Sequence, residues 1–381
     1  MEKKDLIPSY IRNLQVYQSG KPIDDLVREK GLTKVSKLAS NENPLGPSPK
    51  ALKAMQEALS LTHFYPDQHS FNLKSKLAEL YGLKKENIIL GNGSEGIMSY
   101  IMRTFVRPGD QVVTSENTFI GFEIMAKGVG SHLIQVPMNK NFEFDVEAIK
   151  KNITNETRIV YLANPNNPTG TYINKQEFLS LVNVIPPHCL VILDEAYFEY
   201  AKDVNDYPNS MDYRFDNVIT LRTFSKAYGL AGVRIGYGFA HEELISNLTK
   251  VKLPFEPNIL AQKAALAALD DVEHLENTLA LNKEQYKKTF SYLEKKGLSP
   301  IASIANFITF KAHNPERATE IYEQLLDLGV IIRPLKANGM PAHLRVSLGT
   351  VEQMDHFYQA FDEVYSTRPR SKKADHNKKI I

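Results

Sequence analysis

The sequence predicts an α/β fold, in which a large domain with a mostly parallel central sheet flanked by helices is joined to a smaller α+β domain. From about residue 84 onward, short runs of β-branched residues alternate with helical or loop segments, which is the pattern of parallel strands joined by crossover helices. After Gly297 the pattern changes to short strands around a single helix. The 381 residues are also enough for about two domains.

The strands of the large domain are predicted at short apolar runs, because β-branched residues favour an extended backbone. These runs are residues 87–90, 111–114, 158–163, 190–193 and 217–221. Residues 260–295 are predicted to be helical, since they are rich in strong helix formers and carry Lys–Glu pairs. In the smaller domain, the predicted strands are residues 306–310, 329–333 and 343–348.

We expect four parts along the chain. Residues 1–35 contain several turn residues and little periodicity, so they are predicted to be an N-terminal arm over the body or over a partner subunit. The large domain is expected at residues 36–265 and the small domain at residues 266–367. Residues 368–381 are predicted to be a basic, disordered tail, because they hold six basic side chains and one acid.

Charge and composition exclude several classes of protein. Outside the tail, acidic residues slightly outnumber basic ones, so we expect no nonspecific binding to nucleic acid. No apolar run approaches the roughly 18 residues that span a bilayer, so no membrane partner is expected. The only cysteine, Cys189, excludes a disulfide framework or a multi-cysteine metal site, and its apolar neighbours predict a buried thiol. The N-terminus lacks a signal-peptide pattern, which predicts a cytoplasmic protein.

A glycine-rich motif, GNGSEG at residues 91–96, follows the first predicted strand. Its spacing satisfies G-x-G-x-x-G, and Glu116 stands 20 residues beyond Gly96, so a dinucleotide site is one interpretation. More generally, glycines allow a tight turn, and free N–H groups at a helix N-terminus bind phosphate. Ser94 adds a hydroxyl donor that a dinucleotide loop does not need. The motif therefore predicts a phosphate site.

Two further motifs follow buried strands, where ligands of parallel sheets collect. The segment NPNNPTG at residues 164–170 is a rigid loop, and it is either an elaborate turn or a support for an asparagine amide. Asp194 begins the motif DEAY, and Tyr197 ends it. The Asp194 carboxylate could cap the next helix or hold a cationic ring nitrogen.

The fourth motif is TFSKAYGLAGVR at residues 223–234. Lys226 follows a predicted strand and stands between Ser225 and Arg234, whereas a lysine in an arbitrary position is usually a solvated surface charge. To act as a nucleophile, its pKa must fall from the ordinary value of about 10.4. Burial and nearby cations can lower the pKa, which would allow a Schiff base with an aldehyde cofactor.

Taken together, these motifs resemble those of the pyridoxal-phosphate aminotransferases of fold type I, and closely those of the histidinol-phosphate aminotransferase branch. Further marks of that branch are KLASNENPLGPSP at residues 37–49, YPD at 65–67, DEAYFEY at 194–200 and RVSLGT at 345–350. The resemblance covers nearly the whole chain except the tail. It implies a pyridoxal 5′-phosphate enzyme with small-molecule substrates.

The resemblance assigns roles around the cofactor ring. Lys226 would carry the internal aldimine and, once released by substrate, would move the proton between the substrate Cα and the cofactor C4′. Asp194 would pair with the pyridine nitrogen and keep it protonated. Asn167 and Tyr197 would hydrogen-bond the phenolate oxygen O3′, and Phe119 would stack on the ring.

The resemblance also implies a set of ligands for the cofactor phosphate. These are the backbone N–H groups of Ser94 and Glu95, the hydroxyl of Ser225 and the guanidinium of Arg234. Tyr65 matches a tyrosine that reaches this phosphate from the second subunit, which implies a homodimer with shared active sites. The loop departs from many relatives, which have an aspartate near Ser94. Because the implied contacts are backbone donors, cofactor binding should survive this change.

For the substrate, Arg345 matches the residue that holds the α-carboxylate of the amino donor, a task suited to a bidentate guanidinium. Arg333 matches the position used for the phosphate of histidinol phosphate, and Tyr17 a tyrosine that closes over the substrate. The implied reaction exchanges an amino group between glutamate or 2-oxoglutarate and histidinol phosphate or imidazole acetol phosphate.

Other functions stay open at this point. An aminotransferase for phenylalanine or tyrosine would use nearly the same cofactor motifs, and a lyase or decarboxylase could be built on the same scaffold. A dehydrogenase using a nicotinamide dinucleotide would explain only the glycine-rich motif. A non-catalytic relative would be expected to lose Lys226 or Asp194, and both are present.

Overall fold

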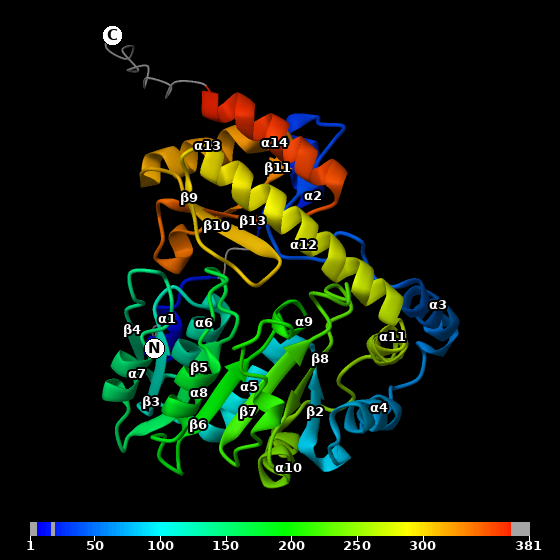
Figure 1. Ribbon diagram of the computed structural model, residues 1–381. Helices are drawn as coiled ribbons and strands as arrows, with labels where there is room; N and C mark the ends of the chain where they lie inside the picture. Colours follow the sequence, from blue (N-terminus) through cyan, green and yellow to red (C-terminus); the bar gives the residue numbers. More distant parts are fainter. Residues whose placement is uncertain (1–5, 17–19, 367–381) are drawn as a thin grey trace.

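The computed structural model describes residues 6–16 and 20–366, and it has a large domain and a small domain that lies above it in Figure 1. The sheet of the large domain contains β2 (Ile88–Gly91), β3 (Gln111–Ser115), β4 (His132–Val136), β5 (Thr157–Ala163), β6 (Leu190–Asp194), β7 (Val218–Thr223) and β8 (Gly236–Phe239). Its spatial order is β2-β8-β7-β6-β5-β3-β4, and β8 runs antiparallel to both of its neighbours. The predicted α/β fold with a mostly parallel sheet is therefore confirmed.

Strands β4 and β8 have no counterpart among the predicted strands. β4 has the sequence HLIQV and is the edge strand beside β3, with mostly half-exposed side chains, so its apolar signal is weak. β8 has the sequence GYGF and is fully buried, but its two glycines are poor strand formers. The other five strands lie within two residues of the predicted runs.

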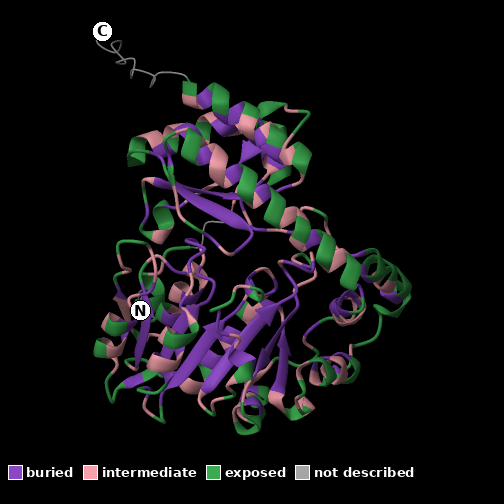
Figure 2. Cartoon of the chain, in the orientation of Figure 1, coloured by how far each residue is buried: buried purple, intermediate pink, exposed green. Residues whose placement is uncertain are grey.

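Helices cover both faces of this sheet, because its central strands are buried on both sides. They are α3 (Pro49–Ala58), α4 (Phe71–Tyr81), α5 (Gly93–Phe105), α6 (Ile120–Gly128), α7 (Val146–Asn152), α8 (Lys175–Val182), α9 (Phe198–Ala201), α10 (Glu242–Val251) and α11 (Ile259–Leu269). In β5, Ile159 and Tyr161 pack in the cluster under α5, α6 and α10. Val160 and Leu162 pack in the cluster under α7 and α8. Figure 2 shows the resulting buried sheet between more exposed helices.

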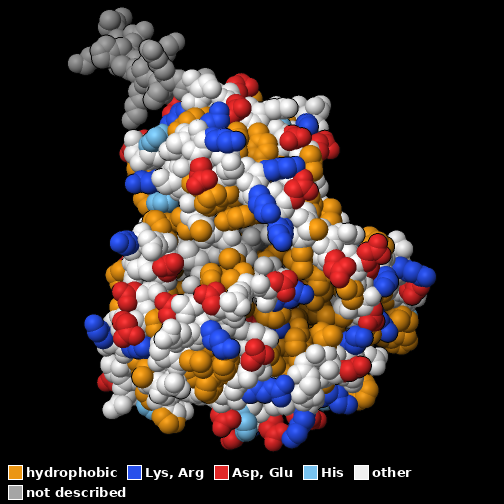
Figure 3. Space-filling model, in the orientation of Figure 1, with side chains coloured by type: hydrophobic (Ala, Val, Ile, Leu, Met, Phe, Trp, Pro, Cys, Tyr) orange, Lys and Arg blue, Asp and Glu red, His pale blue; other side chains and the backbone are white. Residues whose placement is uncertain are grey.

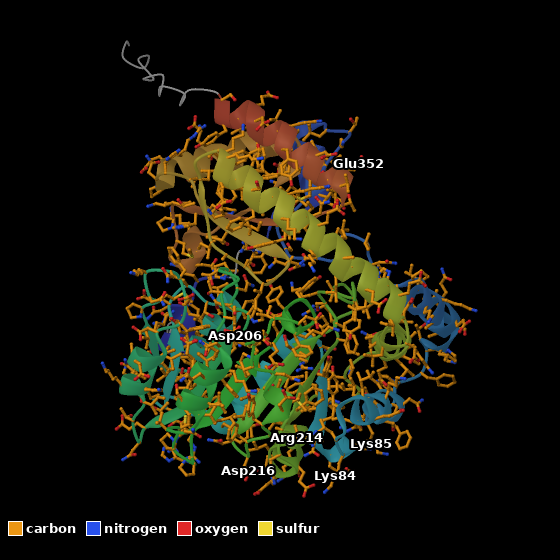
Figure 4. All side chains as sticks on the ribbon, viewed as in Figure 1. Lys84, Lys85, Asp206, Arg214, Asp216 and Glu352 are labelled. Carbon is orange, nitrogen blue, oxygen red and sulfur yellow. The ribbon has the colours of Figure 1, made fainter. Side chains whose placement is uncertain are left out.

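The carboxyl ends of the parallel strands point toward the small domain. Figure 4 shows Lys84 and Lys85, which precede β2, and Arg214 and Asp216, which precede β7, at the base of the large domain, away from the small domain. The strands therefore run from this base upward. Loops that follow β2, β5, β6 and β7 consequently meet at the edge that faces the small domain.

The small domain is an α+β unit around a four-stranded sheet of order β12-β13-β10-β9. Its elements are α12 (Val272–Lys295), β9 (Ser299–Pro300), β10 (Phe307–Lys311), α13 (Pro315–Asp327), β11 (Val330–Ile331), β12 (Arg333–Pro334), β13 (His343–Ser347) and α14 (Val351–Ser366). Helix α12 extends from this domain toward α11 (Figure 1). The predicted helix at 260–295 is thus two helices, separated at Asp270 and Asp271.

Part of the predicted N-terminal arm packs on the small domain. α2 (Ile23–Lys30) buries Leu26 against Ala39 and Ile331, and β1 (Ser36–Lys37) pairs in parallel with β11. The shorter helix α1 (Ser9–Arg12) lies against α6 of the large domain. The predicted basic tail at 368–381 lies outside the described residues. Cys189 is buried, as predicted.

Within the part of the chain that the structure describes, none of the helices combines the length and the apolar character that crossing a bilayer requires.

A buried ion pair joins β7 to the turn after β6. Arg222 Nη2 lies 2.7 Å from Glu195 Oε2, and both side chains are fully buried. The same guanidinium donates to Asn209 Oδ1 at 2.9 Å and lies 3.3 Å from the centre of the Phe198 ring. Such a pair is costly to break, because loss of one partner leaves an isolated charge in the interior.

We expect Arg222→Met to lower the free energy of unfolding by about 3–5 kcal/mol, because Glu195 would then be buried without its partner. The double variant Arg222→Met/Glu195→Gln should lose less, since no isolated charge remains. Urea unfolding followed by circular dichroism measures both variants against the unmodified protein. A single variant as stable as the double variant would contradict this account of the pair.

Candidate active site

A pocket of about 410 Å³ lies at the carboxyl edge of the large sheet and is lined by residues of both domains. It contains most of the residues singled out by the sequence: Ser94, Glu95, Phe119, Asn167, Asp194, Tyr197, Ser225, Lys226, Arg234, Arg333 and Arg345. The strand ends thus bring together residues separated by up to about 250 positions. The parallel topology accounts for the residues of the large domain, whereas Arg333 and Arg345 come from the antiparallel sheet of the small domain.

Lys226 lies just after β7, and its amine is inside the protein. Nζ donates to the backbone carbonyl of Ser40 at 3.0 Å. Burial lowers the pKa of the Lys226 amine to about 8, and the positive charge of Arg345 acts in the same direction. The expected fall of the lysine pKa is therefore present, and about a tenth of the amine is neutral and nucleophilic at pH 7, far more than for a lysine with an ordinary pKa.

Asp194 is the last residue of β6, where its carboxylate faces the pocket. Oδ2 accepts a hydrogen bond from the Tyr161 hydroxyl at 2.9 Å. Oδ1 is buried and makes no well-formed hydrogen bond with the described residues, although the backbone N–H of Ala196 lies near the carboxylate. Burial raises the pKa of Asp194 to about 7, although the bond from Tyr161 opposes this shift. A cationic donor beside Oδ1 would satisfy this oxygen and restore the charged form.

The N-terminus of α5 forms one wall of the pocket and is pressed against the sheet. Gly93 has φ +74°, and a Cβ there would lie 2.7 Å from Arg234 Nη2. A Cβ on Gly236 would lie 2.4 Å from the backbone nitrogen of Ser94. Both glycines are therefore needed for the close approach of helix, strand and guanidinium. The first-turn N–H groups of this helix have no partner within the helix and suit an anion.

Cationic and hydroxyl groups complete this anion-binding wall. Arg234 Nη1 donates to the Ser225 hydroxyl at 3.4 Å and to the Ala231 carbonyl at 3.0 Å. Arg234 Nη2 also pairs with Glu95 Oε2 at 3.2 Å, a contact that the sequence did not predict. The Glu95 carboxylate thus contacts the Arg234 guanidinium at the wall of the pocket, which both residues line.

On the opposite side of Lys226, Asn167 and Tyr197 are held by neighbours from elsewhere in the chain. The Asn167 side-chain oxygen accepts a hydrogen bond from Arg345 Nη1, so its amide N–H groups point away from that guanidinium. Arg345 Nη2 donates to the Ala39 carbonyl at 2.8 Å. The Tyr197 hydroxyl accepts from Asn41 Nδ2 at 2.8 Å.

Two arginines of the small domain stand directly opposite each other. Arg333 of β12 and Arg345 of β13 are register partners in an antiparallel pair, so their side chains leave the same face of the sheet. Both line the pocket. Like charges in this position repel each other, and the repulsion is relieved when each guanidinium faces an anionic group.

Among the predicted site residues that the structure describes, Tyr65 does not line the pocket within this chain. Tyr65 is 78% exposed, and its ring stacks on Phe255 with 4.2 Å between ring centres. Tyr17 lies outside the described residues, so its predicted role remains a prediction.

Three residues of the site were not assigned a role from the sequence. Ser40 and Asn41 belong to the quoted segment KLASNENPLGPSP, and Tyr161 is a polar residue inside an apolar strand. The hydroxyl of Tyr161 in an otherwise apolar strand was a usable signal, because a buried phenol needs a partner. Among residues 6–16 and 20–366, no cluster of three or more His, Cys, Asp or Glu side chains is arranged to hold a metal ion.

Comparison with known proteins agrees with this site. The family model described as aminotransferase class I and II matches residues 33–361. The histidinol-phosphate aminotransferase of Moorella thermoacetica is 43% identical over 357 residues, which cover 93% of this chain and 92% of the relative. Histidinol-phosphate aminotransferase 2 of Carboxydothermus hydrogenoformans is 40% identical, over 92% of this chain and 97% of the relative.

A solved structure gives the same result. The crystal structure of histidinol-phosphate aminotransferase from Sinorhizobium meliloti in complex with pyridoxal-5′-phosphate superposes with a TM-score of 0.86 at 30% identity. The match covers 94% of this chain and 97% of that one. The dinucleotide interpretation of the glycine-rich motif is thereby set aside. The chain belongs to the class I and II aminotransferases, and the relatives named above are histidinol-phosphate aminotransferases.

Proposed function

We propose that this protein is a pyridoxal-phosphate-dependent aminotransferase of histidine biosynthesis. It exchanges an amino group between glutamate or 2-oxoglutarate and histidinol phosphate or imidazole acetol phosphate. The observation that carries the proposal is the opposed pair Arg333 and Arg345, which faces the pocket that also holds the Lys226 amine. The named relatives support the same activity.

The pocket fits pyridoxal phosphate by the chemistry of its groups. Asp194 Oδ1, which lacks a well-formed hydrogen bond, can accept one from a protonated pyridine nitrogen, and the Lys226 amine with its lowered pKa can react with an aldehyde. The helix N-terminus at Ser94, together with Ser225 and Arg234, suits a phosphate. A carboxylate, an amine and an anion cradle in one pocket match the three polar ends of this cofactor.

When bound, the cofactor supplies an aldehyde carbon and a ring that accepts the electrons left on the substrate Cα. Lys226 would hold it covalently, and the free amine of Lys226 would move the proton between the substrate Cα and the cofactor C4′. A lysine with a pKa near 8 is a suitable base for this transfer near neutral pH. Asp194 keeps the ring nitrogen protonated by facing it with a negative charge.

Other residues orient the cofactor and exclude water. Because its oxygen accepts from Arg345, the Asn167 amide would offer its N–H groups to the ring oxygen O3′, and Tyr197 would donate to the same oxygen. Phe119 packs on the ring face at the start of α6. The backbone N–H groups of Ser94 and Glu95 hold the phosphate, with the Glu95 carboxylate turned to Arg234.

The paired arginines select the substrates. Arg345 binds the α-carboxylate, and Arg333 binds the second anionic group, which is the phosphate of histidinol phosphate or the side-chain carboxylate of glutamate. Phenylalanine and tyrosine have a single anionic group and would place no second anion beside Arg333. This arrangement favours histidinol phosphate over an aromatic amino acid.

We also propose a homodimer in which Tyr65 of the partner subunit completes the phosphate site. The stacked and exposed pair of Tyr65 and Phe255, together with the exposed Phe64 and Leu253, supports an apolar contact surface. Figure 3 shows hydrophobic side chains gathered beside α11 and below the lower end of α12. Tyr17 would close over the substrate. A cytoplasmic location is proposed as well, because the substrates belong to amino-acid biosynthesis.

Attachment of pyridoxal phosphate to the cofactor-free protein should follow the pKa of Lys226. Since only the neutral amine reacts, the rate should rise about tenfold per pH unit below about pH 8 and become constant above it. Stopped-flow absorbance measures the rate, and borohydride followed by peptide mapping locates the attachment. Lys226→Ala is the control and should show no attachment. A label on another lysine, or a midpoint near 10.5, would contradict the assignment.

Arg333→Ala should lower kcat/KM for histidinol phosphate by about 10–100-fold, the value of a charged hydrogen bond of ~1.5–3 kcal/mol. With phenylalanine as donor, the change should be within about threefold, because no second anion is lost. Arg345→Ala, by contrast, should impair both substrates. Equal losses for the two donors in Arg333→Ala would favour the aromatic aminotransferase.

The shared site can be tested by mixing chains. In a mixed dimer of a Lys226→Ala chain and a Tyr65→Ala chain, one site has both Lys226 and an intact Tyr65 of the partner subunit. That site should bind pyridoxal phosphate as the unmodified protein does, whereas Tyr65→Ala dimers should bind about 10–100-fold more weakly. Differently tagged, co-expressed chains allow the mixed dimer to be isolated and titrated. Absence of a site with restored affinity would exclude the shared arrangement.

A further inference from the structure

Asn41 is a buried residue at the junction of the two domains, next to the site but without an assigned role. It is 1% exposed and has φ +56°, a left-handed backbone conformation that asparagine tolerates better than most residues. The two residues before it also reach the site. The carbonyl of Ser40 accepts from Lys226, and that of Ala39 accepts from Arg345.

The small domain fixes Asn41 by three hydrogen bonds. Its backbone N–H donates to the Ser347 hydroxyl oxygen at 2.9 Å, and its carbonyl accepts from Asn306 Nδ2 at 3.0 Å. The Ser347 hydroxyl in turn donates to Asn41 Oδ1 at 2.7 Å. All three residues are buried, so water does not compete for these bonds.

These bonds decide which way the Asn41 amide points. Because Oδ1 accepts from Ser347, the amide nitrogen must be the atom that faces Tyr197, and it donates to the Tyr197 oxygen at 2.8 Å. A phenol oxygen that accepts one hydrogen bond directs its own proton elsewhere and becomes a better donor. The orientation of Asn41 therefore governs the direction and strength of the Tyr197 donor.

We propose that Asn41 is a positioning residue that aims the Tyr197 proton at the ring oxygen O3′ of the cofactor, and that Ser347 and Asn306 of the small domain set this aim. The inference rests on the proposed function. It makes the small domain, which carries Arg333 and Arg345, a determinant of the electronic state of the cofactor held in the large domain. Asn41 acts through Tyr197 and does not itself contact the reacting atoms.

The test uses the visible absorbance of the cofactor-loaded protein as a function of pH. The donor from Tyr197 stabilises negative charge on O3′, so its loss lets the nitrogen that links Lys226 to the cofactor keep its proton to higher pH. Asn41→Gly removes the amide while keeping a residue that adopts positive φ without strain. We expect its absorbance midpoint to rise by roughly half to one pH unit, the equivalent of one hydrogen bond.

Ser347→Ala is the second variant, since it frees the Asn41 amide without touching Tyr197, and it should shift the midpoint upward by a smaller amount. The charged groups that act on Lys226, which are Arg345, Glu42, Glu95 and Arg234, are unchanged in both variants.

Thr289→Val is the matched control. It breaks a part-buried hydrogen bond of the small domain, between the Thr289 and Tyr358 hydroxyls at 2.7 Å, so it changes the small domain without changing the Asn41 amide. If Asn41→Gly and Ser347→Ala both have the same absorbance midpoint as Thr289→Val, the inference is wrong. If Asn41→Gly does not bind the cofactor, the comparison of Ser347→Ala with Thr289→Val alone tests the inference. An unmodified protein without a visible band would instead count against the proposed function itself.

Discussion

The site depends on a partly buried amine that has no salt bridge with the described residues. Lys226 bonds to a backbone carbonyl, and among the described residues no carboxylate lies within ion-pair distance of it. An ion pair would hold the lysine protonated, whereas burial beside Arg345 favours the neutral amine. Removing this amine from water costs free energy, and the packing of the large buried sheet offsets that cost.

The parallel sheet determines which groups surround that amine. In adjacent strands, Ala163 is the register partner of Asp194, and Asp194 is the partner of Leu221. The loop after β5, the carboxylate at the end of β6 and the lysine after β7 therefore leave the sheet at the same level. The ion pair of Arg222 with Glu195 ties the last two of these strand ends together in the interior. This ion pair consequently opposes small shifts of β6 relative to β7.

The sequence predicted the residues that follow buried strands, because a polar side chain after an apolar run is a local signal. It did not predict the partners that hold them. The Tyr161 contact with Asp194 and the Asn41 contact with Tyr197 join positions that are 33 and 156 residues apart, so only the folded chain reveals them. The same limit applies to the arm, where α2 becomes part of the small domain through burial of Leu26, a long-range contact.

The two domains contribute different charges to the pocket, and this difference gives substrate binding a structural consequence. The large domain supplies the amine and the cradle for a phosphate, whereas the small domain supplies the opposed Arg333 and Arg345. Under the proposed function, a substrate with two anionic groups would pair with both guanidinium groups while its amino group meets Lys226, so it would bond to both domains at once. A substrate with one anionic group would make only one such contact and would hold the domains together less strongly. The same two residues, Arg333 and Arg345, would therefore both select substrates by their number of anionic groups and link the substrate to the small domain.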